Sequence, residues 1–102
     1  MQDAHAKAVE LREYLYHLGV GSRINYGGSY GFQAGHQAVA VNLNESASRL
    51  VGAIVNGKKA ELEKLMHNLE GEIQIAASTT ILGLPDAEKA LGMLDAIRTL
   101  IK

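Results

Sequence analysis

The sequence predicts an α+β fold: an N-terminal helix, an antiparallel β pair with a long glycine-rich loop, and then two to three helices that cover the pair. Three observations lead to this prediction. Apolar residues recur at helical spacing toward both ends of the chain. Two short β-favouring segments lie between these helical parts, and a glycine-rich stretch separates the two segments.

The chain has 102 residues, of which 47% are apolar, so we expect one domain that spans residues 1–102. It has four tyrosines, one phenylalanine and no tryptophan, and its core must therefore be mainly aliphatic. Small residues that let helices approach closely recur in the helical stripes: Ala47, Ala53, Ala76, Ala77, Ala87 and Ala90. A small core with such stripes predicts a homo-oligomer that is formed through its helices.

The formal net charge of -1 gives no long-range attraction to phosphate backbones, so we expect no binding to duplex nucleic acid. The absence of cysteine excludes disulfides, thiolate chemistry and cysteine-ligated zinc. No apolar run has the length of a membrane span, and residues 1–12 do not resemble a secretion signal. We therefore expect a soluble, cytoplasmic protein without a membrane partner, and no cofactor is indicated.

Asp3 can cap the first helix, and Gly19 can end it. Its apolar residues fall at helical spacing: Ala4, Ala8, Leu11, Leu15 and Leu18. Such a stripe is typical of a helix that packs one face on a core.

The β pair is predicted for Ser22 to Tyr26 and Gln37 to Leu43. In the second segment three apolar residues alternate and would share one face of a strand: Val39, Val41 and Leu43. Gly27 to His36 is too long for a two-residue hairpin turn and too rich in glycine for a strand interior. We expect an ordered or ligand-ordered loop there.

Asn44 can cap the second helix, and Gly57 can close it. Lys58 then opens a third helical pattern. The apolar stripe of the second helix contains Ala47, Leu50, Val51, Ile54 and Val55, and that of the third contains Leu62, Leu65, Met66 and Leu69.

The segment from Glu72 to Leu82 fits both a strand and a helix, because its apolar residues satisfy either period. Its β-branched residues favour a strand. Continuity with the preceding helical stripe favours a helix, although Gly71 costs a helix about 1 kcal/mol. We prefer the helix.

Gly83 and Pro85 interrupt the chain before the last helix, which Asp86 can cap. The apolar stripe of this helix contains Ala87, Ala90, Leu91, Leu94, Ile97 and Ile101. Its spacing is that of an amphipathic helix packed on a core.

The glycine-rich stretch carries the best candidate binding site. Glycines there expose backbone amides, and an arginine can pair with phosphate. Aromatic rings can stack on a base, and amide and imidazole groups can form directional hydrogen bonds that select one ligand over another. The predicted ligand-binding residues are Arg23, Asn25, Tyr26, Gly28, Tyr30, Phe32, Gln33 and His36. They predict non-catalytic sensing or sequestration of a small polar, anionic, nucleotide-like ligand.

Two alternatives stay open. The loop and helix faces would dock a protein partner, or Ser29 and His36 would serve a small hydrolase or transferase, although no acidic residue in the loop orients the imidazole. Glu63 and His67 have the spacing of two metal ligands on one helix, but two ligands without a third make a weak site. We therefore assign no catalytic residue and no metal ligand.

Overall fold

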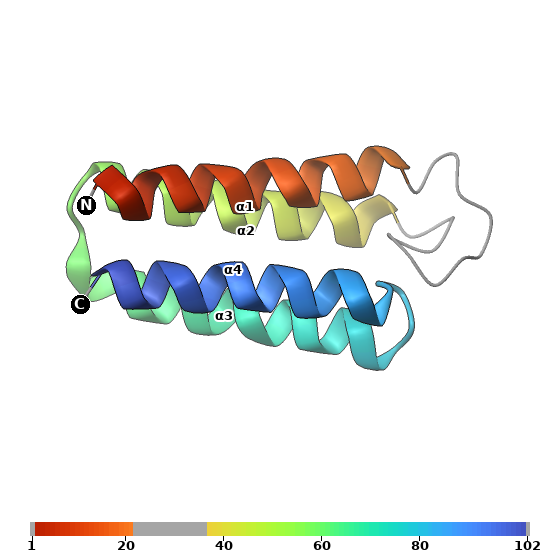
Figure 1. Cartoon of the computed structure of the whole chain (residues 1–102). Helices are drawn as coiled ribbons and strands as arrows, with labels where there is room; N and C mark the ends of the chain where they lie inside the picture. Colours follow the sequence, from red (N-terminus) through yellow and green to blue (C-terminus); the bar gives the residue numbers. More distant parts are fainter. Residues whose placement is uncertain (1, 22–36, 102) are drawn as a thin grey trace.

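The structure is a computed structural model that describes residues 2–21 and 37–101. These residues form four α-helices: α1 (Gln2–Gly21), α2 (Gln37–Val55), α3 (Lys59–Ser78) and α4 (Leu84–Ile101). The helices lie side by side as a bundle in which α1 and α2 form one pair and α3 and α4 the other (Figure 1). Residues 56–58 connect α2 to α3, and residues 79–83 connect α3 to α4.

Each helix contacts two others, so the bundle is square in cross-section. The contacting pairs are α1 with α2, α2 with α3, α3 with α4, and α4 with α1. Over the two described ranges the diagonal pairs, α1 with α3 and α2 with α4, make no contact. The short connections at residues 56–58 and 79–83 place α3 antiparallel to both α2 and α4.

The core lies on the bundle axis, and each helix contributes one apolar stripe. The largest side chains that are fully buried are leucines, isoleucines and one methionine: Leu11, Leu15, Leu43, Leu50, Leu62, Met66, Leu69, Ile73, Leu82, Leu94 and Ile97. No aromatic ring is among them, as the composition predicts. Burial of these stripes stabilises the helices more than their intrinsic propensity does.

Five of the six alanines noted in the helical stripes lie inside the bundle, and Ala77 is only partly buried. Ala47, Ala87 and Ala90 have at most 1% of their surface exposed, and Ala53 and Ala76 are also buried. These alanines bring helices of one chain close together, and they are not available for a contact between subunits. A homo-oligomer has to use other residues.

The prediction of an α+β fold is wrong, because the described residues form no β-strand and residues 37–43, predicted as one, are the first two turns of α2. The alternation of Val39 and Val41 suggested a strand, but Val41 is 52% exposed and does not share a buried face with Leu43. Ala40, Leu43 and Ala47 are buried instead, at the three- and four-residue spacing of a helix.

Asn44 does not cap a helix, because α2 begins seven residues earlier, at Gln37. Its side-chain amide instead donates a hydrogen bond to the carbonyl oxygen of Arg12 on α1, at 3.2 Å. The predicted strand at 22–26 and the predicted loop at 27–36 lie outside the described residues. The predicted β pair is nevertheless wrong, because its second segment, residues 37–43, is helical.

The other predicted helices are present, but some of their predicted ends are wrong. Gly19 does not end α1, which continues to Gly21, and Asp3 and Asp86 lie in the first turns of α1 and α4 and do not precede these helices as caps. Ala4, Ala8, Leu11 and Leu15 are buried along α1. Gly57 follows the end of α2 with a φ of 66°, the left-handed conformation that favours glycine. The ambiguous segment is helical as far as Ser78, and Thr79 to Leu82 lie in the turn that follows.

None of the helices in the described ranges has both the length and the apolar character that a bilayer crossing requires.

Candidate functional site

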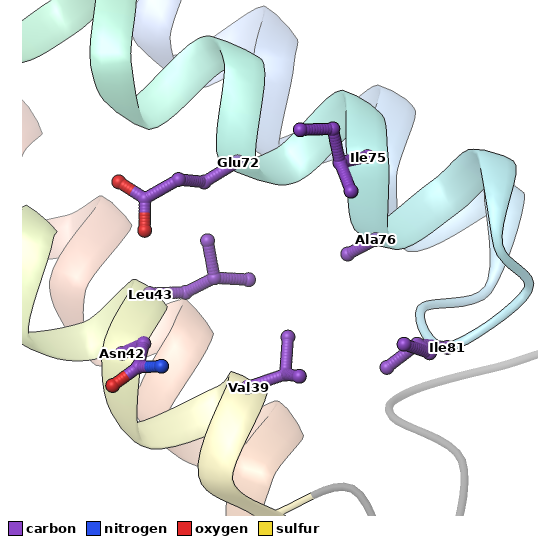
Figure 2. A pocket seen from close by; sticks show the side chains of 7 residues that line it. All are labelled: Val39, Asn42, Leu43, Glu72, Ile75, Ala76 and Ile81. Atoms are coloured by element: carbon purple, nitrogen blue, oxygen red, sulfur yellow. The ribbon is translucent and has the colours of Figure 1, made fainter.

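A cavity of about 190 Å³ lies between α2 and α3, near the end of the bundle where α2 begins and α3 ends. Figure 2 shows its lining in three groups. Val39, Asn42 and Leu43 come from α2, Glu72, Ile75 and Ala76 come from α3, and Ile81 comes from the turn after α3. Residues more than thirty positions apart in the sequence therefore meet here.

The walls of the cavity are largely aliphatic. Leu43 and Ala76 are almost fully buried, so they form its floor together with the core. Ile75 is 65% exposed and stands at the rim, where its side chain is available to a bound molecule. A rim of this kind favours a guest with an apolar face, because binding would remove exposed hydrocarbon from water.

Glu72 and Asn42 bring polar groups to the same cavity (Figure 2). The hydroxyl of Ser46, one helical turn after Asn42, donates a hydrogen bond of 2.9 Å to Oε1 of Glu72. Ser46 is 9% exposed, so this bond ties α2 to α3 from within the interface and orients the carboxylate. A carboxylate has about four acceptor positions, and Glu72 can therefore accept further N–H donors from a guest.

The predicted binding residues are next to this end of the bundle in the chain. Residues 22–36 join the end of α1 to the start of α2, and Val39 of the cavity is the third residue of α2. The turn between α3 and α4 lies at the same end (Figure 1). The first turn of α2 contains no acidic residue, so the partial positive charge of its amide groups is not offset there.

All of the predicted ligand-binding residues lie outside the described residues: Arg23, Asn25, Tyr26, Gly28, Tyr30, Phe32, Gln33 and His36. Ser29, the proposed nucleophile of the hydrolase alternative, lies there too. The predictions about these residues stay predictions.

A second recess, of about 310 Å³, lies between α1 and α2 and is more polar. It is lined by Arg12, Glu13, Tyr16, Asn44 and Ser48. Several of its polar groups already have partners within the bundle: Asn44 bonds to the carbonyl of Arg12, and Ser48 donates to the carbonyl of Asn44 at 2.9 Å. These bonds mainly connect α1 to α2 and leave less capacity for a ligand than the cavity between α2 and α3 has.

The ionisable groups whose pKa is shifted lie in contacts between helices, away from the cavity. Arg98 of α4 donates to Glu70 of α3, and this hydrogen bond lowers the pKa of Glu70. Tyr14 of α1 donates to Asp86 of α4 at 2.8 Å, and burial followed by this hydrogen bond raises the pKa of Tyr14. The ammonium of Lys89 lies 4.8 Å from the centre of the Tyr14 ring. Both pairs join α4 to a neighbouring helix.

Other residues considered for chemistry are not brought together. In the part of the chain that the structure describes, no three histidine, aspartate or glutamate side chains converge as metal ligands. The carboxylate of Glu45 lies 3.9 Å from Arg49 on its own helix, and that of Asp86 accepts a hydrogen bond from Tyr14. Thr79 donates to the carbonyl of Ile75, as a threonine at a helix end commonly does.

Sequence reasoning missed Asn42, Ser46 and Glu72 as site residues. Asn42 and Ser46 are four residues apart, and on a helix they share one face beside an apolar stripe. This signal is visible only when residues 37–43 are interpreted as helix. The alternation of Val39 and Val41 suggested a strand there, so the helical spacing of Asn42 and Ser46 was not recognised.

Comparisons of the chain with models of protein families, with curated proteins and with solved structures found no match. The function therefore has to be inferred from the chemistry and placement of the chain's own residues.

Proposed function

We propose that this protein binds a small polar, anionic, nucleotide-like ligand without transforming it, as a sensor or a sequestering protein does. Residues 22–36 supply the contacts to the charged part of the ligand. The observation that supports this proposal is the position of residues 22–36 in the chain, next to the helix that lines the cavity. The stretch of sequence that is rich in donors and aromatic rings joins α2 only three residues before Val39, which lines the cavity between α2 and α3.

Each part of the proposed site has a distinct role. Arg23 pairs with phosphate through its fork of N–H donors, and the amides of Gly28 and its neighbours support the anion. Tyr26 and Tyr30 stack on a planar ring. The amide groups in the first turn of α2 add a partial positive charge on the same side of the site.

Titration calorimetry of the full chain against mononucleotides, cyclic nucleotides and pyrophosphate tests this function. We expect binding of at least one phosphorylated ligand, and we expect the variant Arg23→Ala to bind it about 10-fold more weakly or worse, because a charged hydrogen bond is lost. Arg49→Ala is the matched control, since Arg49 is an arginine on the exposed surface of α2. No binding by the unaltered chain, or equal binding by Arg23→Ala, would contradict the proposal.

We also propose that the protein is a cytoplasmic homo-oligomer. Among the residues that the structure describes, five large apolar side chains are more than half exposed: Tyr16, Val41, Val55, Ile75 and Leu84. Contact with a second copy would cover part of this surface, which the buried alanines of the stripes cannot do. Native mass spectrometry of the purified chain should show a multiple of the monomer mass, and a monomer at micromolar concentration would contradict this proposal.

A further inference from the structure

We propose that the cavity between α2 and α3 binds the base of the ligand, and that this base is one that presents two adjacent N–H donors beside a carbonyl, as guanine does. The inference rests on the proposed function and specifies which ligand the same site selects. It uses only residues that the structure describes.

The size of the cavity suits a planar ring system. Apolar cavities of about 150 Å³ in protein interiors bind a molecule as large as benzene. The cavity between α2 and α3 has about 190 Å³. It therefore admits a heterocycle larger than benzene, and its open side leaves the sugar and phosphate of the ligand in solvent.

The walls suit one face of a base. Val39 on α2 stands across the cavity from Ile75 on α3, and the buried Leu43 and Ala76 lie at its floor (Figure 2). A flat ring that lies over these side chains contacts carbon on one face. Ile75 at the rim is 65% exposed and would be covered by the ring, so the burial of apolar surface favours binding.

The polar groups of the cavity match the hydrogen-bonding edge of guanine better than that of adenine or cytosine. The carboxylate of Glu72 only accepts hydrogen bonds, and two N–H groups side by side, the ring N–H and the amino group of guanine, match it. On the corresponding edge adenine and cytosine place a ring nitrogen without hydrogen beside the amino group, and its lone pair would face the carboxylate. The amide of Asn42 can donate to the adjacent carbonyl of guanine.

Ser46 acts as a positioning residue for this recognition. Its buried hydroxyl donates to Oε1 of Glu72 at 2.9 Å, which restricts the rotation of the carboxylate before any ligand arrives. An acceptor that is already oriented loses less entropy on binding than a mobile one. Ser46→Ala should therefore weaken binding less than Glu72→Gln does, and in the same direction.

Calorimetry with the four common nucleoside monophosphates tests the inference. We expect guanosine monophosphate to bind about 10- to 100-fold more tightly than adenosine monophosphate, which is the usual discrimination of a bidentate contact to a base edge. Glu72→Gln should remove most of this preference, because an amide presents one acceptor and one donor group. Glu61→Gln, an exposed substitution on the same helix, is the matched control and should keep the preference.

A second variant keeps the test valid if Glu72→Gln unfolds. Ile75→Ser changes an exposed residue and should leave the melting temperature nearly unchanged, yet it removes one apolar side chain from the rim. It should weaken the binding of guanosine monophosphate at least 3-fold. Equal binding of guanine and adenine nucleotides, or an unchanged preference in Glu72→Gln, would overturn the inference.

The outcomes separate this inference from the proposed function. Nucleotide binding that depends on Arg23 but shows no base preference would support the proposed function and reject the guanine site. Binding of unphosphorylated guanosine that is lost in Glu72→Gln and kept in Arg23→Ala would support the guanine site and reject the anion contact. If no nucleotide or nucleoside binds, both are rejected.

Discussion

Arg98 joins α4 to α3 through a group of carboxylates. Its Nη1 lies 3.1 Å from Glu70 and 3.1 Å from Asp95, and its Nη2 lies 3.3 Å from the second oxygen of Glu70. The side chain of Arg98 is 23% exposed and that of Glu70 is 28% exposed, so solvent screens this two-bond contact only in part. The fork of the guanidinium fits such a contact, which a lysine would not reproduce.

Stability in acid should depend on Glu70. Its pKa in the folded chain is lowered from the ordinary value of 4.5, first by the hydrogen bond from Arg98. The stabilisation is therefore fully present above the pKa of the unfolded chain, and it is lost as the pH falls through the folded pKa. Urea unfolding at several pH values should show a weaker acid dependence below pH 4.5 for Glu70→Gln than for the unaltered chain. Glu63→Gln, at a 78% exposed side chain 3.9 Å from Arg98, should resemble the unaltered chain.

Tyr14 should stabilise the chain below pH 10. Removal of its hydrogen bond to Asp86 in Tyr14→Phe should cost about 1 kcal/mol. This corresponds to a melting temperature about 4–8 °C lower for a chain of this size. Because the folded pKa of Tyr14 is raised above 10.0, the unaltered chain should lose this advantage as the pH rises beyond 10 and the unfolded state ionises. Differential scanning calorimetry would measure both effects, with Tyr16→Phe at an exposed position as control.

The glycines of α3 and of the turn before it have opposite conformational roles. Gly71 lies inside α3, and a Cβ atom added there would meet nothing within 4 Å. Gly57 also has open space around it, but its φ of 66° is strained for any residue with a Cβ.

Substitution by alanine should therefore have opposite effects at the two glycines. Gly71→Ala should stabilise the chain by about 0.5–1 kcal/mol, because alanine favours the helix and loses less backbone entropy on folding. Gly57→Ala should destabilise it by about 1 kcal/mol or more. Chemical denaturation followed by circular dichroism would measure both, and a loss of stability in Gly71→Ala would contradict the open space around that residue.

Periodicity predicted each of the four helices of the described residues, because their apolar stripes are continuous. The stripe of α3 continues across Gly71 to Ile73 and Ala76, which are both buried. The start of α2 was missed because Val39 and Val41 alternate there by coincidence, and Asn44 resembles a cap. A local pattern of seven residues fits two periods equally well, and packing against α1 and α3 decides between them.

The candidate site was predictable only in part for a similar reason. The donors and rings of residues 22–36 are evident from their chemistry in the sequence. The cavity is not, because it requires Val39 and Ile75 to meet across two helices. The hydrogen bond from Ser46 to Glu72 also joins α2 to α3, and the sequence of neither helix alone predicts it.

The square packing of the whole bundle depends on small residues at its core. Ala90 on α4 is 0% exposed, in the helix that contacts both α1 and α3. A larger side chain there would have to push two helices apart, since core packing leaves little free volume.

Ala90→Leu should therefore destabilise the chain by about 1–3 kcal/mol, although leucine is more hydrophobic than alanine. Ala60→Leu, at an exposed position in the first turn of α3, should change the stability by less than about 0.5 kcal/mol. Thermal unfolding would compare the two variants. Equal melting temperatures would show that the interior tolerates expansion, against this account of the packing.

The position of α1 along the bundle is fixed by side chains that reach other helices. The amide of Asn44 holds the carbonyl of Arg12, and the hydroxyl of Tyr14 holds Asp86 on the opposite side. The connection from Gly21 to Gln37 therefore has no need to set the alignment of α1, and doubling the length of a flexible connection costs only about 0.6 kcal/mol. A different sequence can therefore be inserted between these two helices while the four-helix scaffold stays in place, much as antibody frameworks carry interchangeable loops.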